Sequence, residues 1–134
     1  MGSRFVPFHP QEVRHGRCRE AELRLPDETR EPGKTRSDIV HLGGTTAARL
    51  TLEPGWSWSA SVKPVVGTEQ CMHRHVGVLQ SGRMRVMHAD GTELVIDAGE
   101  VYVIEPGHDA EVIGDEPVTG YEFEPTAAEE YARG

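Results

Sequence analysis

The chain has 134 residues, a formal net charge of −8 at pH 7 and only two cysteines, so we expect one domain with a sizeable core rather than a disulfide scaffold. The acidic charge disfavours nucleic acids and anionic membranes as partners, because phosphate binding needs clustered Lys and Arg. No secretory signal opens the chain, and no apolar run approaches the roughly 20 residues that span a membrane, which predicts a cytoplasmic protein.

The first predicted element is an N-terminal arm, residues 1–36. It carries eight Lys and Arg against six Asp and Glu, whereas the rest of the chain carries six against sixteen. Pro and Gly interrupt RFVPFHP and EPGKTR, so we expect an extended segment with at most one short helix, between residues 11 and 19. The arm could cover a sheet edge or reach a second subunit, or it could be a loosely ordered terminus. We predict a homodimer in which each arm helps to cover the partner.

Residues 37–126 form the second predicted unit, an all-β domain. Short segments alternate with turn signals such as GG, SG, DG and PGH. The segments are SDIVHL, TAARLTLE, SASVKPVV, CMHRHVGVLQ, RMRVMHA, TELVIDA, EVYVIE, AEVIG and VTGYEF. This pattern is typical of a β-barrel or β-sandwich. Residues 127–134 are expected to form a C-terminal tail.

Two glycine-containing turns predict the strand register. Ser81-Gly82 and Asp90-Gly91 each fit a two-residue hairpin loop. The first loop places His75 opposite His88, and the second places His88 opposite Glu93. These three side chains then share one face with several apolar residues. The opposite face is also partly apolar, so alternation alone does not settle which face is inside, and we choose the face with the histidines as the barrel interior. We therefore predict that the row is the polar centre of the main pocket, with His75 as the catalytic residue.

Residues 55–123 resemble a cupin, and specifically the small single-domain bacterial cupins of unassigned function. The resemblance rests on HVGVLQSGRMRV, DGTELVIDAGE and IEPGHDAEVIGDEP. It implies a cupin-like double-stranded β-helix, or jelly-roll barrel, following the extended N-terminal arm. It also implies a site at the barrel mouth, which in this family commonly holds one divalent metal.

The two sequence motifs of the cupins are present here in altered form. With the first motif aligned on Gly82, His75 stands at the position of the family's glutamate, and Cys71 and Glu69 stand at the positions of its two histidines. In the second motif, Ala110 stands at the position of the histidine. The usual set of three histidines and one glutamate is therefore not intact.

Cys71, His73 and His75 stand at every second position of one predicted strand, and we predict that they bind a metal. Residues two apart on a strand are about 6.7 Å apart, so the three could share one ion only through a bulge and with help from a second strand. His88 or the His108-Asp109 pair could supply that help. Cys with His suits zinc or copper, whereas two His with Glu suit iron or manganese. The predicted cofactor is a divalent transition metal: zinc, copper, iron, nickel or manganese.

The remaining candidates would line a small-molecule pocket. Trp56 and Trp58 alternate on one face, as pocket walls would, although large aromatic residues also fill cores. Glu69, His88 and His108 are the predicted polar contacts to the ligand.

Three classes of function remain open for this barrel. The first is a metal-dependent enzyme, such as an oxygenase, isomerase or lyase, that acts on a small organic substrate. The second is a metal-free barrel that binds or senses a small organic ligand. The third is a metal-free isomerase or dehydratase in which His75 transfers a proton. Cys71 and His75 also have an ordinary structural interpretation, as a buried thiol and a hydrogen-bonded core histidine.

Overall fold

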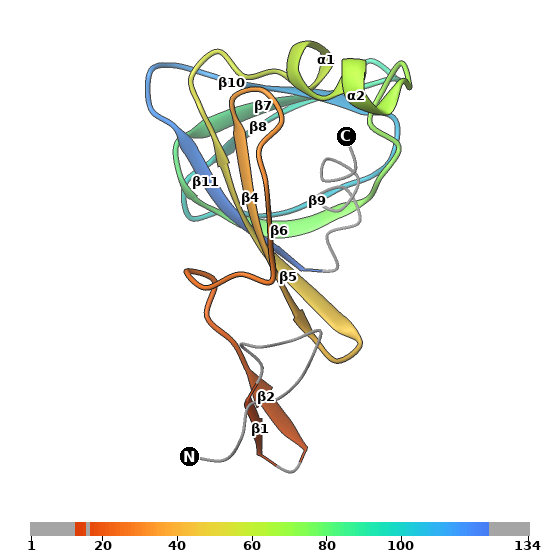
Figure 1. Ribbon diagram of the computed structural model, residues 1–134. Coiled ribbons are helices and arrows are strands. Elements are labelled where there is room, and N and C mark those ends of the chain that lie inside the picture. The colour runs from red at the N-terminus through yellow and green to blue at the C-terminus, as the bar shows by residue number, and fades with distance from the viewer. Residues whose placement is uncertain (1–12, 16, 124–134) are drawn as a thin grey trace.

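The structure is a computed structural model that describes residues 13–15 and 17–123. The predicted tail and residues 1–12 of the arm lie outside the described residues. The strands are β1 (Val13–His15), β2 (Cys18–Glu20), β3 (Glu28–Arg30), β4 (Thr35–Leu42), β5 (Thr45–Leu52), β6 (His75–Ser81), β7 (Arg83–His88), β8 (Glu93–Asp97), β9 (Val101–Ile104), β10 (His108–Val112) and β11 (Val118–Phe123). Two short helices, α1 (Trp58–Ser61) and α2 (Lys63–Val66), connect β5 to β6 (Figure 1).

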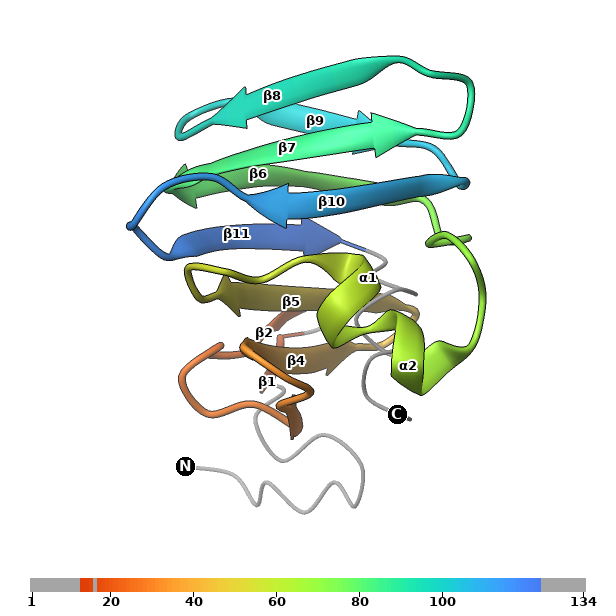
Figure 2. The same ribbon diagram turned by 90° about the horizontal axis from the view of Figure 1, so that it is seen from above.

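Two facing sheets confirm the predicted all-β fold. The larger sheet has six strands in the order β3-β4-β5-β11-β6-β9, and the smaller has three in the order β10-β7-β8. The smaller sheet lies over the β11-β6-β9 half of the larger one (Figure 2). The helices lie at one end of the sheets, where α1 contacts β10.

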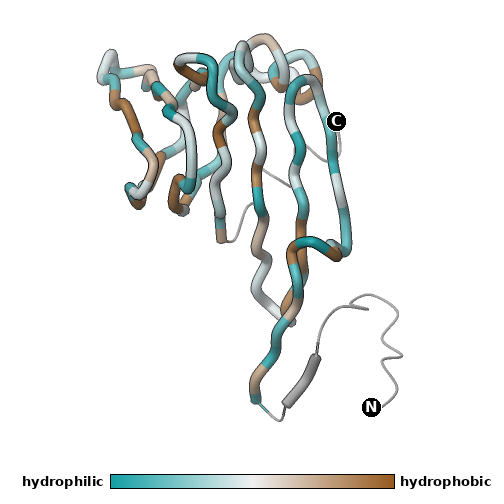
Figure 3. Tube along the Cα trace, turned by 90° about the vertical axis from the view of Figure 1, so that its left-hand side faces the viewer, coloured by the Kyte–Doolittle hydropathy of each residue, from teal (hydrophilic) through white to brown (hydrophobic). Residues whose placement is uncertain are grey.

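The core between the sheets follows from the alternation of side chains along each strand. In β10, and in β6 as far as Leu79, every second residue from the first is buried, and the residues between are more exposed. Hydrophobic and hydrophilic residues are interspersed along the strands of both sheets (Figure 3). Each fully buried aliphatic side chain contributes roughly 1.5 to 3 kcal/mol through removal of apolar surface from water. The largest fully buried apolar side chains are Trp58, Ile39, Leu79, Ile96, Val62 and Val118.

The predicted hairpin at Ser81-Gly82 is wrong. β6 pairs with β9 and β11, whereas β7 pairs with β8 and β10, so the chain passes from one sheet to the other at Gly82. This residue has a φ of +80°, and a Cβ there would lie 2.6 Å from the Pro117 carbonyl oxygen. Glycine thus marks a tight corner, but it does not dictate that the next strand returns beside the previous one. His75 and His88 consequently lie on different sheets.

The predicted hairpin at Asp90-Gly91 exists, but its loop is one residue longer. Met87 lies opposite Glu93, and the His88 N–H donates to the Thr92 carbonyl oxygen over 2.9 Å. A shift of one residue moves every following side chain to the other face. Glu93 is therefore exposed on the outer face, and the predicted row of His75, His88 and Glu93 does not form.

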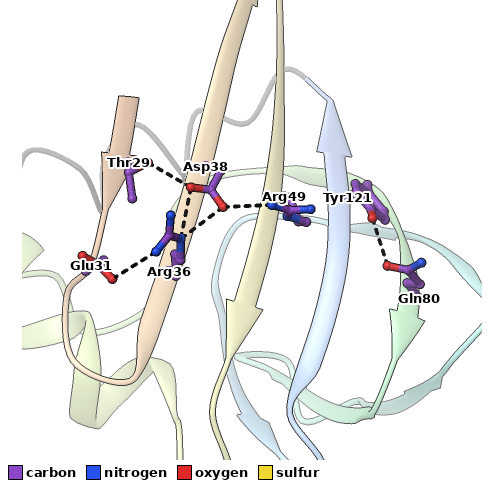
Figure 4. Close-up of polar contacts among 7 residues, drawn as sticks. All are labelled: Thr29, Glu31, Arg36, Asp38, Arg49, Gln80 and Tyr121. Atoms are coloured by element: carbon purple, nitrogen blue, oxygen red, sulfur yellow. Dashed lines mark hydrogen bonds and ion pairs between the residues drawn. The ribbon is translucent and has the colours of Figure 1, made fainter. Parts of the chain in front are cut away.

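A buried carboxylate stabilises the part of the larger sheet that the smaller sheet does not cover. Asp38 in β4 is 2% exposed, although it lies on the face opposite the core. It accepts hydrogen bonds from Thr29 (2.9 Å), Arg36 (3.2 Å) and Arg49 (3.5 Å), as Figure 4 shows. These donors replace the water that the charge loses on burial. The network joins β3, β4 and β5 and belongs to the scaffold.

Part of the predicted arm belongs to the larger sheet. β3 pairs with β4, and the boundary at residue 36 falls inside β4 (Thr35–Leu42). β1 and β2 pair as a small hairpin, where the sequence suggested a short helix. Within the described residues, no helix has the length and hydropathy needed to cross a membrane. The homodimer and the cytoplasmic location stay predictions.

Candidate metal centre

Cys71 and His108 are held together by a short antiparallel bridge between two chain segments. The Cys71 N–H donates to the His108 carbonyl oxygen over 2.8 Å, and the Gly107 N–H donates to the Cys71 carbonyl oxygen over 2.8 Å. Gly107 has a φ of +94°, which glycine adopts readily and which turns the chain into β10. Both side chains are buried, Cys71 at 1% and His108 at 3% exposure.

His75 brings a third donor to the same point. It is the first residue of β6, and its Nε2 lies 3.4 Å from Cys71 Sγ. A continuous strand would separate positions 71 and 75 by about 13 Å, so the chain between them must bend, and residues 72–74 indeed belong to no strand. The metal-ligating atoms of Cys71, His75 and His108 all lie within 4.8 Å of one another.

Both imidazole rings use Nδ1 for a contact outside this cluster. His75 Nδ1 lies 3.0 and 3.2 Å from the two carboxylate oxygens of Glu122. His108 Nδ1 lies 2.7 Å from the Glu105 carbonyl oxygen. A carboxylate and a carbonyl only accept hydrogen bonds, so each Nδ1 donates, and Nε2 is the atom left for a metal. Histidines that bind metals are commonly oriented by such acceptors.

Glu122 was not singled out from the sequence. It is 3% exposed in β11 and also accepts a hydrogen bond from the Tyr102 hydroxyl over 2.8 Å. It stands 47 positions from His75, so no local motif links the two. The segment VTGYEF contained one indication of this role. Its buried positions are Val118, Gly120 and Glu122, and a charged residue on an inward face is rarely found without a partner.

A cavity of about 30 Å³ lies beside the cluster. A water molecule needs roughly 10 to 15 Å³ of such space, so the cavity admits a small molecule or one end of a larger one. The lining residues are Leu50, Leu52, Trp56, His75, Leu79, Met84, Tyr102, Ile104, His108, Ala110, Val118, Gly120 and Glu122. Two of the three donor residues thus face this mostly apolar space.

The three donors fit a zinc-like ion. With a Zn–S bond of about 2.3 Å and a Zn–N bond of about 2.05 Å, a tetrahedral centre places sulfur and nitrogen about 3.6 Å apart. The distance of 3.4 Å between Cys71 Sγ and His75 Nε2 is close to this value. One Cys and two His leave a fourth position open, as in catalytic zinc sites. The thiolate favours zinc or copper over manganese.

Cys71 and His75 shift each other's pKa in opposite directions. Burial raises the pKa of the Cys71 thiol, but hydrogen bonds with His108 and His75, and the charge of His75, outweigh burial and lower the pKa to about 6. Burial lowers the pKa of His75, but the charge of Glu122 and the contact with Cys71 outweigh it and raise the pKa to about 10. Between these values, a thiolate faces an imidazolium.

The ionisation of Cys71 can be followed directly in metal-free protein. In a Cys18→Ser background, Cys71 is the only thiol, and its ultraviolet thiolate absorbance should rise with increasing pH around a midpoint of about 6. After unfolding, the midpoint should move up towards the usual value of 9.0. The additional change His75→Asn should raise the midpoint in the folded protein, because the stabilising cation is lost. A folded-state midpoint near 9 would contradict the charge separation.

His73 was predicted as a metal ligand, but the cluster contains His108 instead. The bend between residues 71 and 75 explains this difference, because strict alternation applies only to an extended strand. The predicted ligand contact Glu69 lies away from the cavity: its side chain is 90% exposed and pairs with Lys63 over 3.2 Å.

The other predicted pocket residues are divided among different environments. Trp56 lines the cavity, whereas Trp58 is 1% exposed in the surrounding apolar core. His88 pairs with His108 across β7 and β10, but its Nε2 lies 2.8 Å from the Pro106 carbonyl oxygen. It lines a separate groove along β8 and β9.

Comparison with known proteins gives matches among solved structures. No family model matches the sequence, and no curated protein matches it. Oxalate decarboxylase from Bacillus subtilis aligns with a TM-score of 0.56 at 25% identity, over 77% of this chain and 28% of the other. The formate complex of oxalate decarboxylase from Lactobacillus farciminis aligns with a TM-score of 0.54 at 20% identity, over 72% and 30%. The chain thus spans less than a third of these enzymes.

A protein closer in size also matches. An uncharacterized conserved protein with a double-stranded β-helix domain from Klebsiella pneumoniae aligns with a TM-score of 0.51 at 18% identity, over 68% of this chain and 71% of the other. Its architecture agrees with the two facing antiparallel sheets described above. These likenesses confirm the predicted fold, a cupin-like double-stranded β-helix.

Proposed function

We propose that this cupin binds one zinc or copper ion through Cys71, His75 and His108 and supports metal-assisted chemistry on a small organic molecule. The convergence of three buried donors within 4.8 Å carries this proposal. When bound, the ion would act as a Lewis acid that polarises an oxygen of the substrate. The Mn(II) centres named for the Bacillus subtilis oxalate decarboxylase support a metal in general, whereas the thiolate here favours a softer ion.

The protein's own groups define what can react at this centre. His75 and His108 line the cavity, so a molecule that enters it lies beside the donors. The surrounding Leu, Val, Ile and Met side chains exclude water, which strengthens electrostatic interactions inside. The small volume selects a compact reacting group, while the rest of a larger substrate would remain outside.

A second candidate function is a metal-free binding barrel. Cys71 and His75 already contact each other over 3.4 Å, and as a thiolate and an imidazolium they satisfy each other without an ion. The largely apolar cavity beside them would then hold a small organic ligand.

The metal content of the protein decides between these functions. We expect protein purified without chelators and without added metal to hold about one zinc or copper ion per chain by elemental analysis, because three preformed donors and an open position suit such ions. Metal stripped by a chelator should rebind, and cobalt in its place should show a thiolate charge-transfer band. Protein that arrives empty and binds none of zinc, copper, iron, nickel or manganese would overturn the metal proposal and favour the binding barrel.

A further inference from the structure

Glu122, Gly77 and Tyr102 form one row across three adjacent strands of the larger sheet. Glu122 in β11 is the direct neighbour of Gly77 in β6, and Gly77 is the direct neighbour of Tyr102 in β9. The row lies on the inner face, and His75 stands two positions before Gly77 on the same face of β6. The carboxylate of Glu122 therefore meets both the Tyr102 hydroxyl (2.8 Å) and His75 Nδ1 (3.0 Å).

The absence of a side chain at Gly77 makes this meeting possible. A Cβ there would lie 2.9 Å from Glu122 Cγ and 2.9 Å from the Tyr102 hydroxyl oxygen. A Cβ essentially never lies this close to an atom to which it is not bonded, so any larger residue would push the two side chains apart. Gly120 adds clearance on the neighbouring strand, where a Cβ would lie 3.5 Å from the same hydroxyl.

Burying the carboxylate of this row lowers the stability of the fold. Glu122 is 3% exposed, and burial of an ionised carboxylate costs several kcal/mol unless partners compensate for the lost water. Among the described residues, its hydrogen-bond donors are His75 and Tyr102. An apolar residue would fill the same space with no such cost, so the row is better explained by what the carboxylate does to His75.

We infer that Glu122, held by Tyr102, is a positioning residue that fixes the ring of His75 with Nδ1 turned away from Cys71 and Nε2 turned towards it. The part of this inference that concerns metal affinity rests on the proposed function. The carboxylate holds a proton on Nδ1, which leaves Nε2 as the donor atom and makes it more basic. The Tyr102 hydroxyl donates a hydrogen bond to Glu122 Oε2. This hydrogen bond opposes rotation of the carboxylate away from His75.

The test uses two conservative variants and a matched control. Glu122→Gln keeps the shape and an acceptor oxygen but removes the charge, and Tyr102→Phe removes only the hydroxyl. Glu93→Gln makes the same charge change at an exposed position of β8. Zinc affinity is measured by competition with a chromophoric chelator. In metal-free protein, the His75 ring is followed by 1H–15N NMR, and urea unfolding gives the stability.

We expect Glu122→Gln to weaken zinc binding by about 10- to 100-fold, which is the usual effect of removing the hydrogen-bond partner of a metal ligand. Tyr102→Phe should weaken it less, and Glu93→Gln should not change it. In the metal-free protein, the Nδ1–H signal of His75 should be far downfield and slow to exchange in the wild type. It should shift upfield and exchange faster in Glu122→Gln.

The possible results separate this inference from the proposed function. If wild-type protein binds no metal, the proposed function is wrong, and the Nδ1–H signal still decides the positioning role. An unchanged signal in both variants, or zinc affinities equal to wild type despite lower stability, would mean that Glu122 is only structural. If Glu122→Gln fails to fold, Tyr102→Phe provides the same comparison with the loss of a single oxygen atom.

Discussion

Replacing His108 with alanine is expected to abolish tight zinc binding, whereas replacing His73 with alanine should leave it unchanged. His108 is one of three buried residues whose ligating atoms lie within 4.8 Å of one another, and His73 is not. Loss of one of three ligands should exceed the 10- to 100-fold effect of losing a ligand's hydrogen-bond partner, so we expect a decrease of more than about 100-fold. The sequence alone predicted His73 as a metal ligand and named His108 only as one candidate for an additional ligand, which makes the pair of variants decisive.

The two histidine variants are compared by chelator competition at the same pH. His88→Ala serves as a second control, because His88 lies opposite His108 in the ladder yet directs its Nε2 to the Pro106 carbonyl oxygen. Circular dichroism of each metal-free variant checks that the fold is intact. A large loss of affinity in His73→Ala together with none in His108→Ala would show that the ligand set is wrong.

Gly77→Ala is expected to lower the free energy of unfolding by about 3 kcal/mol or more, at the upper end of what overpacking a core costs. A Cβ at this position would clash with the Tyr121 carbonyl oxygen as well as with Glu122 and Tyr102. The backbone oxygen belongs to the neighbouring strand β11 and cannot move without breaking the ladder. The added methyl group must therefore displace β6 from β11 in the middle of the larger sheet.

Urea unfolding of metal-free protein measures this effect without interference from an ion. Gly44→Ala is the matched control, because a Cβ there would have no heavy atom within 4 Å and its φ is not in the left-handed region. That variant should be as stable as the wild type or slightly more stable, since alanine reduces the freedom of the unfolded chain. Equal stability of the two variants would contradict the packing described around Gly77.

Much of the centre was predictable because the chemistry of its residues is visible in the sequence. Cys71 and His75 were candidates from their residue types, and the motif aligned on Gly82 placed both at positions that hold ligands in cupins. The second motif placed the last ligand at Ala110. The structure has His108 in the cluster, two residues earlier and on the same inward face of β10, because side chains repeat every second position.

The register of the strands was not predictable from the turns. A Ser-Gly or Asp-Gly pair indicates that the backbone reverses or bends, but the sequence does not record which strand becomes the neighbour. At Gly82 the competing partners β9 and β11 already occupy both edges of β6, so β7 joins the other sheet. At Gly91 one additional loop residue moved Glu93 to the outer face, because a shift of one residue exchanges the two faces of a strand.

The sequence by itself determined most of the strands and the class of fold, because these depend on local alternation and turn residues. It was wrong over residues 59–66, where it predicted a strand and the structure has α1 and α2, and it placed Glu93 on the wrong face of β8. It also supplied the thiol and the imidazoles that make a metal centre conceivable. Only the tertiary structure decided which of them meet: the bend before β6 brings Cys71 to His75, the bridge at Gly107 adds His108, and the pairing of β11 with β6 places Glu122 behind His75. These contacts join positions up to 47 residues apart, and strand pairing over such distances is decided by the packing of the whole barrel rather than by any short segment.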